Sequence, residues 1–268
     1  MSAIAPPQAQ RPISGFTDIL RSEFLKLSTV RSTYWTLLAA VVFNVGLAVV
    51  LAVFLPDALS AEDKATVDIT RLSLGGIHLS QIAFGVLGVL VMTSEYGTGM
   101  IRATFAAVPR RRLVLAAKAI VFSVIALTVG ILTSFAAYVG FQSVLSDDGL
   151  RSSIGDPGVL RALIGGGLYL TALGLLGLGL GAIIRASAGA IATLFGLIFV
   201  PPLLMTLLPH SWQTTITPYV PMEAGSQIFV AARQDPGSLG PWTGFGVFAL
   251  YVVLALVGGF VLINHRDA

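Results

Sequence analysis

The chain has 268 residues, of which 55 % are hydrophobic and only 11 % are charged, and its mean hydropathy is +0.87. Soluble domains carry about 25 % charged residues. This composition therefore excludes an ordinary soluble protein and indicates one that uses the bilayer as its solvent. In a membrane protein, the basic residues behind the net charge of +3 are first placed relative to the membrane, and no nucleic-acid partner is expected. The lack of cysteine excludes disulfides and thiolate metal sites, and no metal centre is expected.

The N-terminal segment divides into two parts. Residues 1–12 are rich in Ala, Pro and Gln, and we expect them to be disordered. Residues 15–30 show the periodicity of an amphipathic helix, which fits the headgroup region with its apolar face in lipid. The alternative is a polar lead into the first span. The apolar face holds Phe16, Ile19, Leu20, Phe24 and Leu27, and the opposite arc holds Asp18, Arg21, Glu23 and Lys26.

Six long apolar runs follow, and each is long enough to cross a bilayer as a helix. None alternates with period 2, so helices are favoured over a β-barrel. The sequence thus predicts an all-α integral membrane protein with a single transmembrane domain over residues 13–268. The runs cover residues of about 36–55, 75–94, 116–145, 159–184, 188–208 and 242–264.

A polar and basic segment, SEYGTGMIRATFAAVPRRRLVLAAK (Ser94–Lys118), separates the second run from the third. Apolar side chains recur in it at helical spacing, which predicts a short helix with one apolar face. Arg102 lies off that face. Because water does not suit such a face, lipid or a partner is expected to cover it. The face consists of Met100, Ile101, Thr104, Phe105 and Val108.

Glycines and charged residues flank this predicted helix. Gly97 and Gly99 free the backbone to turn out of the second run, and Pro109 ends the helix. Arg110–Arg112 follow where the chain re-enters the membrane, and anionic lipid would attract them. Glu95, at the membrane edge, is expected either to pair with an arginine of this loop or of the N-terminal helix, or to act as a solvated residue or a cap.

Later runs carry features that concern packing. Gly174, Gly177 and Gly181 in the fourth run allow close approach of helices, either within this chain or between subunits. Pro201-Pro202 in the fifth run removes two backbone donors and predicts a break or kink, as a gate or as a static feature. A short surface helix is expected over residues 224–232, in the loop before the last run.

Basic residues orient the six runs. Eleven of the 16 Lys and Arg fall on the side that holds both termini, and the positive-inside rule places that side in the cytoplasm. The segment that ends at Lys118 is then a cytoplasmic loop. The eleven are Arg11, Arg21, Lys26, Arg31, Arg102, Arg110, Arg111, Arg112, Lys118, Arg185 and Arg266; the other five are Lys64, Arg71, Arg151, Arg161 and Arg233.

These residues also carry a resemblance. The stretch EYGTGMIRATFAAVPRRRLVLAAK, between two spans, resembles the first cytoplasmic loop of permeases of the type-2 ABC transporter family: a Glu followed by Gly-Thr, a short helix, an arginine cluster and a Lys opening the third span. The segment RSEFLKLSTVRSTYW (residues 21–35) is similar to the elbow helix of that family. Six spans and a long loop before the last one also match, so the resemblance covers nearly the whole chain.

The resemblance implies a function and partners. Residues 99–108 would be a coupling helix that docks on a separate ABC ATPase subunit, and two permease subunits, identical or different, would surround one pathway. ATP and Mg would bind the partner ATPase, and no cofactor is expected in this chain. The chain would be a multi-pass protein of the plasma membrane, exporting a hydrophobic or amphipathic substrate by alternating access. The residues that contact the substrate are unknown.

Other functions stay open. No Walker A motif is present, and no Ser/His or paired-carboxylate constellation points to an enzyme. A secondary carrier working without ATP is one alternative, although no ionisable residue stands within a span away from its ends. A membrane anchor or sensor that recruits a soluble partner is another. The helix at 99–108 would then lie on the inner leaflet or hold that partner.

Overall fold

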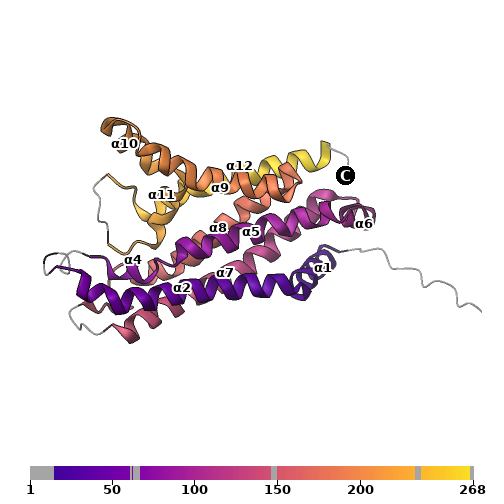
Figure 1. Cartoon of the computed structure of the whole chain (residues 1–268). Coiled ribbons are helices and arrows are strands. Elements are labelled where there is room, and N and C mark those ends of the chain that lie inside the picture. The colour runs from indigo at the N-terminus through magenta and orange to yellow at the C-terminus, as the bar shows by residue number, and fades with distance from the viewer. Residues whose placement is uncertain (1–14, 61, 63–66, 146–149, 233–236, 266–268) are drawn as a thin grey trace, which may run out of the picture.

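The computed structural model describes residues 15–60, 62, 67–145, 150–232 and 237–265 (Figure 1). The expected disorder of residues 1–12 lies outside these residues. The described residues form helices and no strands, which confirms the all-α prediction. The elements are α1 (Phe16–Thr29), α2 (Arg31–Ala58), α4 (Ile69–Ser73), α5 (Ile77–Gly97), α6 (Met100–Ala107), α7 (Arg111–Val144), α8 (Val159–Ile184), α9 (Ser187–Met205), α10 (His210–Ile216), η2 (Thr217–Tyr219), α11 (Pro221–Ser226), η3 (Gln227–Phe229) and α12 (Pro241–His265).

Six of the described helices are long and apolar enough to cross a membrane, as the sequence predicts: α2, α5, α7, α8, α9 and α12. The chain therefore has the character of a multi-pass membrane protein. Two of these helices are longer than expected, because polar residues at their ends are also helical. Helix α2 begins at Arg31, and α7 begins at Arg111, so Lys118 lies two turns inside α7 rather than at its start.

The spanning helices run roughly alongside one another, and the short elements gather at the two ends of the bundle (Figure 1). Helices α1 and α6 and the C-terminal end of α12 lie at one end, which we call the α6 end. Elements α4, α10 and α11 lie at the opposite end, which we call the α11 end. The two ends of the described chain thus share the α6 end.

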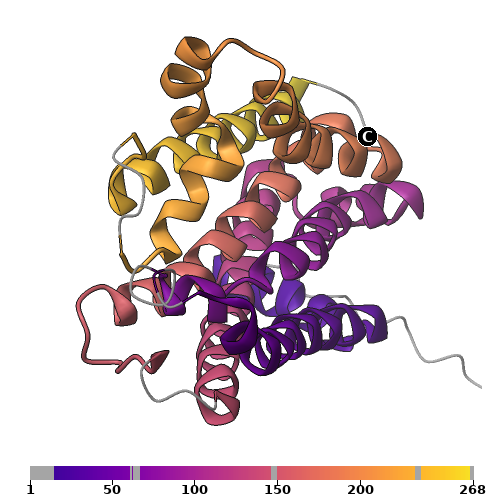
Figure 2. The same ribbon diagram turned by 60° about the vertical axis from the view of Figure 1, so that its left-hand side comes forward.

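Helix α8 is the centre of the bundle, between α5 and α7 on one side and α12 on the other (Figure 2). Its glycines permit this position. A Cβ atom on Gly177 would lie 2.7 Å from the carbonyl oxygen of Gly85, and one on Gly181 would lie 3.1 Å from that of Val89. A Cβ on Gly174 would overlap the ring of Phe122. These three glycines are therefore used in packing within the chain, which brings the backbones of α5 and α8 together.

Helix α9 does not break at its two prolines. It continues through Pro201 and Pro202 to Met205, so the break is absent, whereas the alternative of a kink stays a prediction. A proline removes the bond to the carbonyl four residues earlier. The bonds that are missing are the two that residues 201 and 202 would donate to the carbonyls of residues 197 and 198, and the helix ends within four residues of them. Nothing in this geometry assigns them a gating role.

The segment over 221–230, at the α11 end, is buried rather than on the surface, so the predicted surface helix is wrong in its location. It forms α11 and η3, and Ala224, Ile228 and Phe229 are 0–2 % exposed. The ring of Phe229 lies edge-on to Tyr169 and His78, at centroid distances of 5.3 and 5.9 Å. The segment therefore enters the end of the bundle, where its apolar side chains find partners.

Two charged side chains hold this segment by its backbone. The guanidinium of Arg161, on α8, donates to the carbonyl oxygens of Ile228, Val230 and Ala231 at 3.1, 2.9 and 3.2 Å. The carboxylate of Asp68, which caps α4, accepts from the backbone N–H of Ala232 at 2.9 Å. Charge-assisted bonds of this kind are stronger than neutral ones. They fix the path of the segment between the ends of α4 and α8.

Candidate functional site

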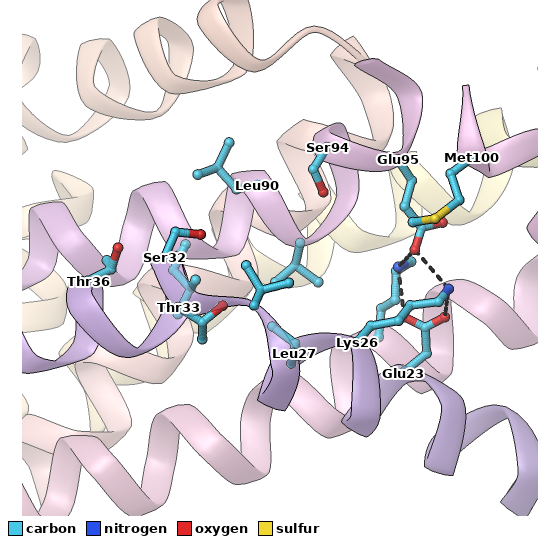
Figure 3. A pocket seen from close by; sticks show the side chains of 14 residues that line it. Glu23, Lys26, Leu27, Ser32, Thr33, Thr36, Leu90, Ser94, Glu95 and Met100 are labelled. Atoms are coloured by element: carbon cyan, nitrogen blue, oxygen red, sulfur yellow. Dashed lines mark hydrogen bonds and ion pairs between the residues drawn. The ribbon is translucent and has the colours of Figure 1, made fainter. Parts of the chain in front are cut away.

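Four charged side chains from three helices meet at the α6 end, and we call them the ion cluster: Glu23 and Lys26 of α1, Glu95 of α5 and Lys118 of α7 (Figure 3). Each lysine bonds both carboxylates. The Nζ atom of Lys26 lies 2.7 Å from Glu23 and 2.9 Å from Glu95. The Nζ atom of Lys118 lies 2.7 Å from Glu23 and 2.5 Å from Glu95. The cluster therefore joins three helices through side chains alone.

The ion cluster is almost closed to the exterior. The side chains of Lys118, Glu95 and Glu23 are 2, 3 and 4 % exposed, and that of Lys26 is 31 % exposed. Two positive and two negative charges balance, which is what allows them to be buried. Removing one partner from such a group typically costs about 3–5 kcal/mol, because it leaves a buried charge uncompensated.

The pKa of Lys26, the partly exposed member of the ion cluster, follows from these contacts. Burial by itself lowers the pKa of Lys26, but the hydrogen bonds and charges of Glu23 and Glu95 outweigh it, and the pKa of Lys26 lies above the usual 10.5. Lys26 is thus charged at all physiological pH values, and its ammonium is a permanent donor at the edge of the cluster.

Helix α1 faces the bundle differently from the prediction. Its buried residues are Ile19, Glu23 and Leu27, which recur every fourth position on one face, whereas Phe16 and Phe24 are 37 and 51 % exposed. Glu23 was predicted on the solvated arc, and that assignment is wrong. The spacing from Ile19 to Leu27 contained the signal, because a residue midway between them at helical spacing shares their face.

Glu95 also bonds α6. Its second oxygen accepts from the hydroxyl of Thr104 at 3.2 Å, so the ion cluster reaches a fourth helix. The pairing of Glu95 with an arginine was wrong, because its partners are Lys26 and Lys118. Lys118 can bond Glu95 because it lies two turns into α7 and faces α1 and α5. Polar residues predicted to stand at the membrane edge are instead buried together there.

The apolar face of α6 is covered by this chain itself. Ile101, Phe105 and Val108 are 2, 8 and 8 % exposed and belong to the main hydrophobic core. The expectation that these side chains are covered by a partner or by lipid is therefore corrected: four- and three-residue steps place them on the side that packs against the bundle. Met100, the fourth apolar member of the predicted face, is 46 % exposed.

The opposite face of α6 is open. Arg102, as predicted, points outward, and the remaining exposed residues of α6 are Met100 and three alanines: Ala103, Ala106 and Ala107. Of the two glycines before α6, Gly99 has a φ of +72°, a conformation that favours glycine, and it turns the chain back onto the bundle. Gly97 has an ordinary φ and open space around it, so its lack of a side chain is not required there.

The arginine cluster divides between the bundle and the exterior. Arg111 stacks over the Phe105 ring at 5.1 Å and donates to the carbonyl of Ile263 at 3.4 Å, near the end of α12. Arg112 lies beside the amide of Asn264. Arg110 is exposed, next to Pro109. Cations favour a helix C-terminus, so Arg111 and Arg112 tie the α6–α7 connection to the end of α12, a role that the sequence did not reveal.

No model of a known protein family matches the sequence, and no curated protein matches it. Among the described residues, no group of three His, Asp or Glu side chains could hold a metal ion. The ion cluster and the exposed face of α6 together form the candidate functional site.

Proposed function

We propose that the chain is the membrane-spanning permease subunit of an ATP-driven exporter of the type-2 ABC kind, and that α6 is its coupling helix. The observation that carries the proposal is the position of α6. One face of it is buried in the bundle, the other is open, and Glu95 connects it to α1 and α7 through buried charges. A short helix held in this way can pass a displacement to several spans at once.

The exposed face of α6 supplies the docking surface in this proposal. It consists of small alanines beside Met100 and Arg102, so a partner can approach the helix backbone closely and place a carboxylate against the guanidinium. Phe105, a member of the predicted apolar face, does not contribute to this surface because its ring is buried. The partner is an ABC ATPase subunit, which binds and hydrolyses ATP with Mg.

The ion cluster is the joint of the mechanism. When the ATPase subunits close on ATP, α6 moves with them, and Thr104–Glu95 and the two lysines move α1, α5 and α7 together. Charged hydrogen bonds resist stretching more than apolar contacts resist sliding, so such a joint favours a rigid-body motion. The spans then open away from the α6 end, which faces the cytoplasm in this proposal. A second permease subunit, identical or different, completes the pathway.

A second candidate is a proton-coupled secondary carrier. The sequence counted against it because no buried ionisable residue was evident, whereas Glu23, Glu95 and Lys118 are in fact buried. Buried carboxylates are the usual groups for proton relay. Each carboxylate here is bonded to two ammonium groups, and these contacts join α1, α5 and α7 rather than line a path for protons. The ATP-driven exporter is the better supported of the two.

The two candidates separate in one experiment. Ala106→Trp places a large side chain on the open face of α6 and leaves the buried face intact, so it should block docking without unfolding the chain. We expect the variant to insert and melt like the wild type, but to lose co-purifying ATPase subunits and the ATP hydrolysis of the complex. Leu132→Trp, at a 64 % exposed position of α7, is the matched control. Transport that persists in Ala106→Trp and follows a proton gradient would reject the exporter in favour of the carrier.

A further inference from the structure

A half-open cavity lies between α2 and α5 where they diverge towards the α6 end, and residues of α1 also line it. Nearer the α11 end their backbones touch: a Cβ on Gly76 would lie only 2.6 Å from the carbonyl oxygen of Asn44. One turn on, the hydroxyl of Ser80 donates to the carbonyl oxygen of Ala40 at 2.6 Å. Beyond this point the helices separate and leave a cavity of about 180 Å³, which begins beside Thr36 on α2.

The walls of this cavity differ along its length. On the α5 side they are apolar, formed by Leu87, Leu90 and Val91. On the α2 side the hydroxyl-bearing Thr33 and Thr36 line it. Towards the α6 end the wall is the ion cluster (Figure 3). A ligand that fits the whole cavity therefore needs a hydrocarbon part and a polar part.

The polar end of the cavity presents positive charge. Although the ion cluster is neutral, its carboxylates are 3–4 % exposed, whereas the side chain of Lys26 is 31 % exposed. An ammonium group has three N–H donors, and the two carboxylates use two of them on Lys26. The third donor remains for a ligand at this end of the cavity. An anionic oxygen is the complementary group.

The depth of this end matches that of a lipid headgroup. Helix α2 begins at Arg31 and α5 ends at Gly97, so Lys26 and Glu95 lie at the ends of two helices long enough to span a bilayer. In a bilayer that these helices span, that position is the headgroup region. Basic pockets between membrane helices at that depth bind the phosphate of lipid headgroups. A free phosphate would satisfy Lys26 but would leave the apolar wall against water.

We propose that this cavity holds one phospholipid, with its phosphate on the Lys26 ammonium and part of one acyl chain against Leu87, Leu90 and Val91. The lipid contacts α1, α2 and α5 and so fills the space beside the ion cluster. The proposed function places the α6 end in the cytoplasm, and the lipid would then belong to the cytoplasmic leaflet. Only this choice of leaflet rests on the proposed function. Occupancy itself does not depend on ATP or on a partner ATPase.

Native mass spectrometry of the delipidated chain in detergent tests the proposal, with dioleoyl-phosphatidylglycerol as the probe. We expect one lipid per chain to bind, and Leu90→Trp, which fills the cavity, to weaken that binding at least tenfold. Val124→Trp is the matched control, because Val124 is 62 % exposed on α7, and it should bind like the wild type. Equal binding by the two tryptophan variants would overturn the proposal.

Two additions make the outcome decisive. Melting curves establish that Leu90→Trp is folded, and Thr36→Phe, which fills the cavity from α2, replaces it if it is not. Inorganic phosphate and glycerol 3-phosphate are added as competitors without acyl chains, and neither should displace the lipid at equal concentration. Displacement by either would overturn the acyl-chain part of the proposal and identify a phosphate site. Because these measurements use no ATPase, failure of the lipid site and failure of the exporter function are distinguishable.

Discussion

The two ends of the bundle are held by different kinds of bond. At the α6 end, charged side chains bond one another, in the ion cluster formed by Glu23, Lys26, Glu95 and Lys118. At the α11 end, Arg161 and Asp68 bond the backbone of a buried segment. A bond between two side chains requires particular residues at both positions. A bond from a side chain to a backbone carbonyl requires only one such residue, together with the right path of the chain.

This difference indicates which end can move as a unit. The charges of the ion cluster connect α1, α5 and α7, and the Thr104 hydroxyl connects α6 to Glu95. A displacement of one of these helices therefore displaces the other three. At the α11 end, Arg161 fixes one local segment, and aromatic contacts of Phe229 with Tyr169 and His78 complete its packing. In the proposed function, the α6 end therefore transmits motion and the α11 end closes the bundle.

The strongest way to break the comparison is to remove the deepest charge of the ion cluster. Lys118→Met leaves Glu23 and Glu95 buried with only Lys26 between them. We expect a loss of about 3–5 kcal/mol in the free energy of unfolding, measured by thermal and denaturant unfolding in detergent. Arg110→Met, at an exposed position in the same connection, should change stability little. Equal stability of Lys118→Met and wild type would show that the cluster does not hold the α6 end together.

A smaller and more local effect is expected at the α11 end. Arg161→Met removes the donors to three carbonyl oxygens, and a hydrogen bond to a charged group typically contributes about 1.5–3 kcal/mol. We expect a total loss near the low end of that range, because Arg161 is partly exposed and water can replace part of the bonding. Hydrogen exchange should rise over residues 221–232 and stay unchanged in α1 and α6. Raised exchange in α6 as well would mean that the two ends are coupled.

The titration of Lys26 sharpens the comparison with a milder change. The pKa of Lys26 is raised in the folded chain, so its stabilising contribution is fully present below the unfolded value of 10.5 and is lost as the pH rises through the folded value. We expect wild-type stability to fall more steeply above pH 10.5 than that of Lys26→Met, measured by melting temperature across this range. Parallel pH profiles for the two proteins would contradict the assigned contacts of Lys26.

The least disturbing test asks which end faces the cytoplasm. The chain has no cysteine, so single cysteines report their own positions. Ala106→Cys, on the open face of α6, should be protected from a membrane-impermeant thiol reagent in intact cells, and Thr214→Cys, exposed on α10, should be labelled. Neither change should alter stability. The opposite labelling pattern would reverse the orientation and remove the docking proposal.

Much of the architecture could be predicted from the sequence. Runs of apolar residues without alternation determine six spanning helices, because the bilayer requires both their length and their internal hydrogen bonding. Helical spacing also predicted α1, and it predicted α6 between Gly99 and Pro109. These are local properties, and each depends on side chains close together in the chain.

The identity of the contacts could not be predicted in the same way. Periodicity shows that α6 has an apolar face, but not whether lipid, a partner or this chain covers it, and the fold decided on the last. A charge near the end of a span can be stabilised by water, by headgroups or by another charge, and all three are compatible with the same sequence. The sequence by itself determined the spans and their amphipathic neighbours. Only the tertiary structure placed Glu23, Glu95 and Lys118 in one buried cluster, because burial of a charge depends on partners that lie as many as 95 residues apart.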